Sequence, residues 1–185
     1  AARWSCWRGR RPSAGPAHRA RLDAQGRQTA GDRASKTIAL HTRIYAAARA
    51  FDANTACVIH THSTHCVALT LHESQHELLP ALTPYFVMKV GHVPVIAYHR
   101  PGAPEAAEQV AQAIARRGAA GTPIRAVMLA RLGPNVWHDT PAAAMAVLEE
   151  LEETARLQAL AGAAGPAPLT PEQIDELRTT FGARW

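Results

Sequence analysis

Short apolar segments rich in β-branched residues alternate with longer segments of helical periodicity along most of this chain. Buried strands are expected where the apolar run is short and lies between turn residues, and helices where apolar residues recur every three or four positions. The expected strands are residues 55–62, 86–91, 93–99 and 124–133. The expected helices are residues 35–50, 103–118, 140–162 and 169–181. Because strands and helices that alternate must pack against one another, this order predicts a layered α/β domain.

Several residues mark the ends of these elements. Ser35 and Thr140 are expected as helix N-caps, since a hydroxyl oxygen can accept a hydrogen bond from a free N–H of the first turn. Pro141 then occupies the first helical position. The strand that ends near residue 133 is expected to run into a tight turn at Gly133–Pro134. Residues 63–72 fit either a short helix or a strand, since their apolar period does not decide between the two.

The charge of the chain is concentrated at its beginning. Residues 1–33 hold eight Arg against only Asp23 and Asp32, and the rest of the chain is close to neutral, although the whole chain carries a formal charge of +5. A basic segment of this kind is not a basic domain face, and no aromatic residues are interleaved with basic ones after it. The sequence therefore argues against nucleic-acid binding. We expect residues 1–20 to form a disordered or aberrant basic arm and residues 21–185 to form the domain.

The remaining composition indicates a single cytoplasmic domain. The 185 residues are enough for one sizeable core. No apolar run approaches the roughly 20 residues that span a bilayer, and no apolar segment of a signal peptide follows the first Arg residues. The three cysteines, Cys6, Cys57 and Cys66, are an odd number without the spacing of a metal site. They argue against a disulfide framework.

The stretch "CVIHTHSTHCVALTL" places His60, His62 and His65 inside apolar sequence. Alternate side chains on a strand share one face, so His60 and His62 should point the same way. Two imidazoles at the end of one strand can hold one metal ion. The alternative is that these are ordinary core or surface histidines with hydrogen-bond partners. The spacing alone leaves both interpretations open.

The surroundings of the histidines resemble a known family. The segments "IHTHSTHCVAL", "GDRASKTIALHTRIYAAARAFDANTACVIHTHSTH" and "LTPYFVMKVGHVPVIAYHRPG" are similar to the class II aldolase/adducin family. The segments "HSTH", "PYFVMKVG" and "ELEETA" most resemble its branch of 3-oxo-tetronate 4-phosphate decarboxylases. The resemblance covers roughly residues 21–177. It implies a three-layer α/β/α domain with a central, mainly antiparallel sheet, whose N-terminal part is missing or altered in this chain.

The resemblance also implies a chemistry. In this family a zinc ion held by histidines stabilises the enediolate that forms when a carbon–carbon bond breaks. His60 and His62 match the first two metal ligands, and Ser35 and Lys36 match the segment that binds the substrate phosphate. The implied reaction is decarboxylation of a 3-oxo-tetronate 4-phosphate to a triose phosphate in a cytoplasmic homo-tetramer. A sugar-phosphate aldolase or a ribulose-phosphate 4-epimerase is an alternative within the family.

Two positions depart from the family pattern. Thr37 stands where the family has its acid/base Glu, and Leu132 stands where it has its third metal-ligating His, directly after Arg131. A threonine hydroxyl cannot act as a carboxylate base near neutral pH. Other histidines could replace the third ligand, although nothing in the sequence requires it: these are His41, His65 and His138. A second class of function therefore stands beside the lyase, namely a non-catalytic pseudoenzyme or an adducin-like interaction domain.

Overall fold

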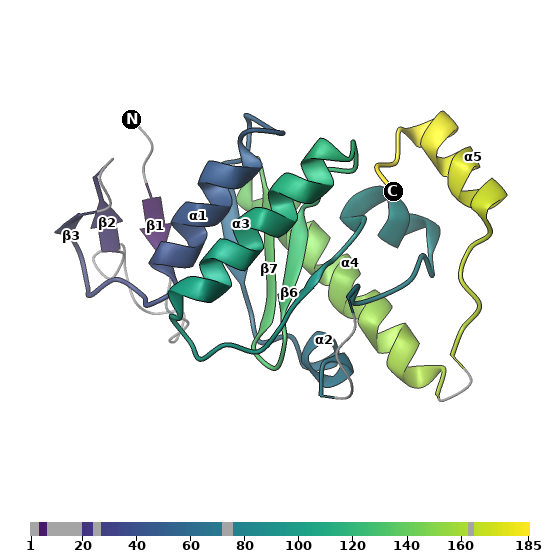
Figure 1. Ribbon diagram of the computed structural model, residues 1–185, viewed down its shortest axis with the longest axis horizontal. Helices are drawn as coiled ribbons and strands as arrows, with labels where there is room; N and C mark the ends of the chain where they lie inside the picture. The colour runs from purple at the N-terminus through teal and green to yellow at the C-terminus, as the bar shows by residue number, and fades with distance from the viewer. Residues whose placement is uncertain (1–3, 7–19, 24–26, 72–75, 163–164) are drawn as a thin grey trace.

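A computed structural model describes residues 4–6, 20–23, 27–71, 76–162 and 165–185. Its main sheet has four strands in the order β4–β7–β6–β5, and helices cover both faces (Figure 1). The pairs β4–β7 and β7–β6 are antiparallel, and the pair β6–β5 is parallel. The strands are β4 (Cys57–His60), β5 (Val95–Ile96), β6 (Ala126–Leu129) and β7 (Gly133–His138). The expected central, mainly antiparallel sheet is confirmed.

Two apolar clusters hold the helices against the two faces of this sheet. Alternate residues of each strand point to opposite faces, so neighbouring residues of β7 enter different clusters: Trp137 packs with α1 and α3, and Val136 packs with α2, η2 and α4. The result is the three-layer α/β/α arrangement predicted from the sequence. These helices are α1 (Ile38–Ala48), α2 (Thr64–Leu69), η2 (Phe86–Val90), α3 (Pro104–Ala119) and α4 (Pro141–Leu160).

The last helix, α5 (Pro171–Phe181), packs Leu177 against Ala81 and Val87. Its N-cap is Thr170, whose side chain accepts a hydrogen bond from the backbone N–H of Gln173 while the Gln173 side chain accepts one in return. This reciprocal pair satisfies two N–H groups that the first turn leaves free. Within the described residues, no helix is both long and apolar enough to cross a membrane.

A second, small sheet lies beside the main domain (Figure 1). It consists of β1 (Trp4–Cys6), β2 (Ala20–Leu22) and β3 (Gln28–Ala30), paired antiparallel in that order. The three residues of β1 belong to the predicted arm of residues 1–20, and their backbone pairs with β2. Residues 1–3 and 7–19 of the arm lie outside the described residues, so the division of the chain at residue 20 stays a prediction.

Three local predictions need correction. Helix α1 begins at Ile38, and its N-cap position is Thr37 rather than Ser35. Residues 86–90 form a π-helical turn instead of a strand, because Phe86, Val87 and Val90 bury one side of a turn that ends at Gly91, where φ is +76°. The tight turn comes before Gly133–Pro134 in the chain, because those two residues already begin β7. The ambiguous segment after the histidines is helix α2.

The turn between β6 and β7 contains a strained residue. Leu132 N–H donates to Leu129 O at 3.0 Å, which closes a four-residue turn, and Arg131 at its third position has φ +63°. A non-glycine side chain in this region costs about 1 kcal/mol. Arg131 also ties the turn to α2, since its backbone N–H donates to Thr70 Oγ1 at 2.9 Å. The strain is therefore held in place by the surrounding contacts.

We expect Arg131→Gly to be more stable than Arg131→Ala by about 1 kcal/mol, because only the alanine keeps a Cβ in the left-handed region. Both variants lack the guanidinium, which donates to Leu71 O from an exposed position, so their difference isolates the backbone term. Urea unfolding of the two proteins measures it. Equal midpoints and slopes for the two variants would show that the turn is not strained.

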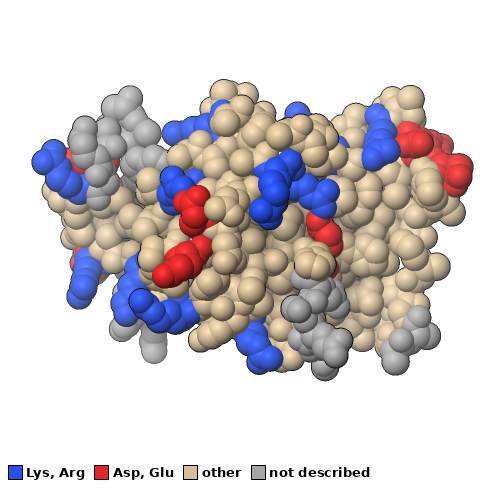
Figure 2. Space-filling view, viewed as in Figure 1, with Lys and Arg blue, Asp and Glu red and all other residues tan. Residues whose placement is uncertain are grey.

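Charged residues of both signs share the molecular face that α1 and α3 cover. In Figure 2, Lys and Arg on this face lie beside Asp and Glu rather than forming one continuous basic surface. Arg43 of α1, for example, pairs with Glu108 of α3. Opposite charges on α1 and α3 thus pair across the two helices on this face.

Candidate functional site

The segments that carry the predicted site residues meet at one end of the main sheet. The C-terminal end of β4, the β6–β7 turn and the first residues of α1 and α3 all lie at the lower end of the molecule in Figure 1. Gly133 lies against the HxH segment: a Cβ built on it would lie 1.9 Å from Thr61 O. Only a glycine can accept a backbone carbonyl at this position. The contact between Gly133 and Thr61 thus fixes the path of the backbone between His60 and His62.

His60 and His62 lie side by side. Their ring centroids are 5.3 Å apart, although β4 ends at His60 and His62 is exposed beyond it. Nδ1 of His60 lies 3.0 Å from Pro134 O. Since a carbonyl only accepts, Nδ1 carries the proton and Nε2 is left with a free lone pair. Metal-binding histidines are commonly oriented in this way.

Burial lowers the pKa of His60, and this effect exceeds the opposing one of the hydrogen bond to Pro134. The nearby His62 acts in the same direction as burial. The neutral ring that results is the form that binds metal ions. His60 is therefore suited to be a metal ligand, and this role stays a prediction.

The predicted phosphate-binding segment stands at the start of α1. Ser35 Oγ and Thr37 Oγ1 are 2.9 Å apart, and Thr37 N–H donates to Ser35 Oγ at 3.3 Å. Lys36 is exposed, and its Cβ lies 3.8 Å from a Cβ built on Gly102, in the loop before α3. The starts of α1 and α3 are therefore neighbours, and the partial positive charges of both helix ends favour an anion between them. The roles of Ser35, Lys36 and Thr37 stay predictions.

A polar pair is buried beneath His60. Asn135 is the partner of His60 in the β4–β7 register and is fully buried. Within the described part of the chain, neither carboxamide atom of Asn135 nor Nε2 of His41 meets the geometry of a hydrogen bond, yet Asn135 lies close enough to raise the pKa of His41. Burial and the charge of His60 outweigh this effect and lower the pKa of His41 to about 4. His41 is therefore neutral near pH 7.

The described side chains do not complete a zinc site of the usual kind. Such a site takes three protein ligands and an open position. Among these residues, no three side chains of His, Cys, Asp or Glu are grouped so that they could hold a metal ion. Leu132 instead packs against the apolar cluster under α1 and α3. The sequence position of the third ligand is thus occupied by a partly buried apolar side chain that cannot bind a metal ion.

Two of the three possible substitutes have other partners. His65 is bound to Glu152, and His138 is bound to Asp139. His138 also pairs with Cys57 at the start of β4, whereas His60 lies at its end. The third, His41, is close enough to His60 to feel its charge, and among the described residues it does not complete a three-residue group.

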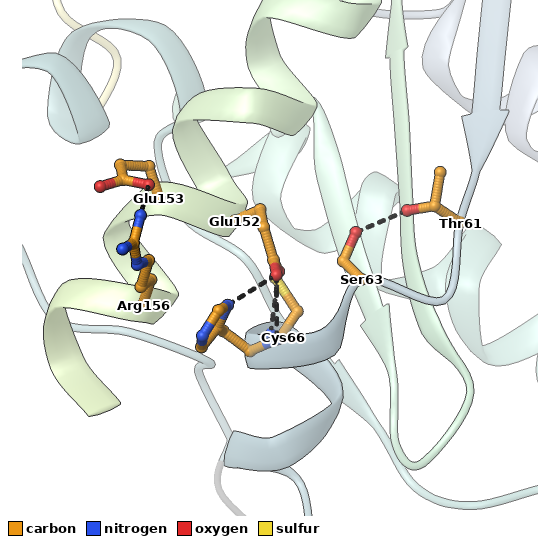
Figure 3. A network of polar contacts seen from close by, with 7 residues as sticks. Thr61, Ser63, Cys66, Glu152, Glu153 and Arg156 are labelled. Carbon is orange, nitrogen blue, oxygen red and sulfur yellow. Dashed lines mark hydrogen bonds and ion pairs between the residues drawn. The ribbon is translucent and has the colours of Figure 1, made fainter. Parts of the chain in front are cut away.

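Glu152 is the site residue that the sequence did not reveal. Its carboxylate accepts hydrogen bonds from the backbone N–H groups of His65 and Cys66, at 3.0 and 3.1 Å, and from the His65 ring at 2.8 Å (Figure 3). The carboxylate thus caps α2 from the neighbouring helix α4. Arg156 of the same helix pairs with Glu153 at 3.5 Å and leaves Glu152 to these contacts.

The hydrogen bonds that Glu152 accepts keep it ionised. Burial raises its pKa, but the backbone and ring N–H groups of His65, together with Cys66, lower it by more. A carboxylate that accepts several N–H bonds is favoured in its charged form. Glu152 therefore brings a stable negative charge to the start of α2, directly after the paired histidines.

A mainly antiparallel sheet between helices, with paired histidines at the end of β4, defines a domain of the class II aldolase type. The family model of the class II aldolase and adducin N-terminal domain matches residues 13–159, so the chain belongs to this family. The match begins inside the predicted basic arm of residues 1–20.

The chain is similar to several bacterial decarboxylases. It is 46% identical over 176 residues to the 3-oxo-tetronate 4-phosphate decarboxylase of Cupriavidus necator, which covers 92% of this chain and 76% of that protein. The enzyme of the same name from Escherichia coli K12 is 33% identical over 168 residues, covering 89% and 73%. That from Pectobacterium atrosepticum is 35% identical over 159 residues, covering 85% and 68%.

Solved structures agree with the fold. YgbL from Escherichia coli superposes with a TM-score of 0.72 at 32% identity, covering 88% of this chain and 74% of that one. An L-fuculose 1-phosphate aldolase superposes with a TM-score of 0.67 at 22% identity, covering 92% and 74%. The second likeness concerns the fold alone.

Proposed function

We propose that this protein is a lyase that decarboxylates a 3-oxo-tetronate 4-phosphate to a triose phosphate. The names of its bacterial relatives support this substrate. The observation that carries the choice of reaction is Thr37, whose hydroxyl is hydrogen-bonded to Ser35 where the family resemblance calls for a carboxylate base.

The three reactions considered for the family differ in their need for a base. Cleavage of an aldol, and epimerisation by the same route, begin when a base removes a hydroxyl proton. Decarboxylation of a 3-oxo acid begins from the ionised carboxylate, and no proton has to be removed. The electron pair of the breaking bond moves toward the 3-oxo group, where positive charge or hydrogen-bond donors stabilise the enediolate. A site with Thr37 in place of Glu is therefore compatible with decarboxylation and poorly suited to the aldolase and epimerase alternatives.

The chain's own residues would act on the two ends of the substrate. Ser35, Lys36 and the adjoining starts of α1 and α3 would bind the phosphate, since N–H groups, a hydroxyl and an ammonium group all favour an anion. His60 and His62, at the end of β4, would face the carbonyl and the hydroxyl. Together these groups would orient the carboxylate for loss as CO2.

Zinc remains the expectation from the family resemblance, but the donor set does not fit it fully. His60 and His62 offer two nitrogens, so we expect weaker metal binding than at a site with three histidines. Elemental mass spectrometry on protein purified without an affinity tag measures the zinc per chain. The matched proteins are the His60→Ala, His62→Ala double variant, expected to hold less zinc, and Leu132→His, expected to hold more. If the parent holds no more zinc per chain than the double variant, His60 and His62 are not zinc ligands.

The activity test uses the whole chain and both configurations of 3-oxo-tetronate 4-phosphate. We expect CO2 and triose phosphate in equal amounts, and no cleavage of L-fuculose 1-phosphate. Cleavage of the aldol substrate without CO2 release would contradict the proposal. Thr37→Glu is the control. Because CO2 release needs no carboxylate base at this position, the variant should release CO2 no faster than the parent.

A non-catalytic role is the second candidate, and Leu132 favours it because an apolar, partly buried side chain stands at the position of the third ligand. An inert parent together with an active, zinc-binding Thr37→Glu, Leu132→His variant would establish that candidate. A homo-tetramer and a cytoplasmic location are also proposed on the family resemblance. Sedimentation of the purified protein tests the first of these.

A further inference from the structure

The pair of His65 and Glu152 has the geometry of an acid/base group. Nδ1 of His65 lies 2.8 Å from a carboxylate oxygen of Glu152, and that carboxylate is itself fixed by two backbone N–H groups. A carboxylate on Nδ1 sets the tautomer and orientation of the ring. Nε2 is then the nitrogen that gains and loses protons. The His65 side chain is 36% exposed, so solvent can recharge it.

His65 follows the paired histidines closely along the chain. His65 is the second residue of α2, and α2 begins directly after His62 and Ser63. The intervening chain is held by the bond of 2.6 Å between Thr61 Oγ1 and Ser63 Oγ (Figure 3). Since consecutive Cα atoms are about 3.8 Å apart, the Cα atoms of His62 and His65 are separated by at most about 11 Å.

Other carboxylate-bound histidines of the described chain are less suited to this role. His138 and Asp139 lie at the start of β4, opposite Cys57, and not at its end. His92 stacks on Trp185 with ring centroids 4.3 Å apart, and its nearest carboxylate oxygen, on Glu77, is 3.7 Å away. Thr37 has only a hydroxyl. His65 is therefore the described histidine that combines a carboxylate partner at hydrogen-bond distance with a place only three residues after His62.

We propose that His65 is the catalytic proton donor of the decarboxylation, positioned by Glu152. This inference rests on the proposed function and adds the step that follows loss of CO2. The bond between the carboxyl carbon and C2 breaks and CO2 leaves. The electron pair of that bond stays with C2 and forms the double bond between C2 and C3 of the enediolate. C2 then takes the proton from Nε2 of His65, the C3 carbonyl is restored, and water returns a proton to the ring.

The stereochemistry of the new C–H bond reports on the donor. In D2O a donor fixed on one side of the enediolate places one deuterium on the hydroxymethyl carbon of the triose phosphate in a single configuration. We expect this from the parent protein. His65→Gln should slow turnover about 100-fold or more and give a product of mixed configuration, because water then protonates both faces. His138→Gln, which removes a carboxylate-bound histidine from the other end of β4, is the control and should match the parent.

The possible failures can be told apart. No CO2 from the parent would overturn the proposed function and this inference with it. CO2 from the parent, with an unchanged rate and configuration in His65→Gln, would overturn only the role of His65. If His65→Gln does not fold, the parent alone still tests the idea, because the reverse step should exchange only one of the two hydroxymethyl hydrogens of the triose phosphate in D2O. Exchange of both at equal rates would overturn it.

Discussion

Replacing Gly133 by alanine is expected to lower the free energy of unfolding by about 3 kcal/mol or more. Two costs combine at this residue. Its φ is +135°, outside the region that residues with a Cβ adopt. The added Cβ would also lie 1.9 Å from Thr61 O, which is a backbone atom and cannot turn away as a side chain can.

The damage should spread to the paired histidines. Pro134 follows Gly133, and its carbonyl oxygen accepts two hydrogen bonds. One comes from Nδ1 of His60 at 3.0 Å and the other from the N–H of Thr61 at 3.3 Å. Moving the backbone to admit a Cβ would break these two bonds at the same time. The variant should therefore lose the fixed orientation of the His60 ring as well as stability.

Urea unfolding measures the loss, and Gly121→Ala supplies the matched control. Gly121 has φ +79°, but a Cβ built there meets nothing within 4 Å. The control should cost about 1 kcal/mol, the backbone part alone. A loss at Gly133 no larger than the loss at Gly121 would mean that the Thr61 contact is not tight.

The second large effect is a loss of stability in acid caused by His41. Burial, aided by the charge of His60, lowers the pKa of His41 from 6.5 in the unfolded chain to about 4 in the fold. The unfolded state therefore binds a proton more readily, and the contribution of neutral His41 is complete above pH 6.5 and is lost as the pH falls toward 4. Between pH 7 and pH 5, metal-free protein should lose about 2 kcal/mol through this residue.

Denaturant titrations at several pH values test this expectation. His41→Leu should show a flatter profile between pH 7 and pH 5, since leucine cannot bind a proton. His76→Leu, the same substitution at an exposed histidine, is the control. Parallel curves for the parent and His41→Leu would refute the assignment.

The periodicity of the sequence predicted most of the layers but not all of their ends. Apolar spacing found α1, α3, α4 and α5, because amphipathic helices bury one continuous face. It missed β7, whose segment "GPNVWH" opens with residues typical of turns and carries the buried Asn135. It also mistook η2 for a strand, because a short apolar run has the same composition in either structure.

The site was predictable only where its residues are neighbours along the chain. The spacing of His60 and His62 predicted that they meet, and their rings do lie together. Nothing in the sequence predicted that Glu152 reaches α2, because a single Glu on a polar helix face is ordinary. The same holds for the pair of His41 and Asn135, which depends on how α1 lies on β7.

The histidines form hydrogen bonds with residues far away in the sequence, and this affects the order in which the protein folds during synthesis. Strand β4 is an edge strand whose partner is β7, and the bond from His60 to Pro134 spans 74 residues. The bond from His65 to Glu152 spans 87 residues. During synthesis the histidine segment leaves the ribosome long before either partner exists, and closing such long loops is slow. We expect the histidine segment to be ordered among the last parts of the fold, after α4 has formed, so that a nascent chain released before residue 152 would contain the histidines without their geometry.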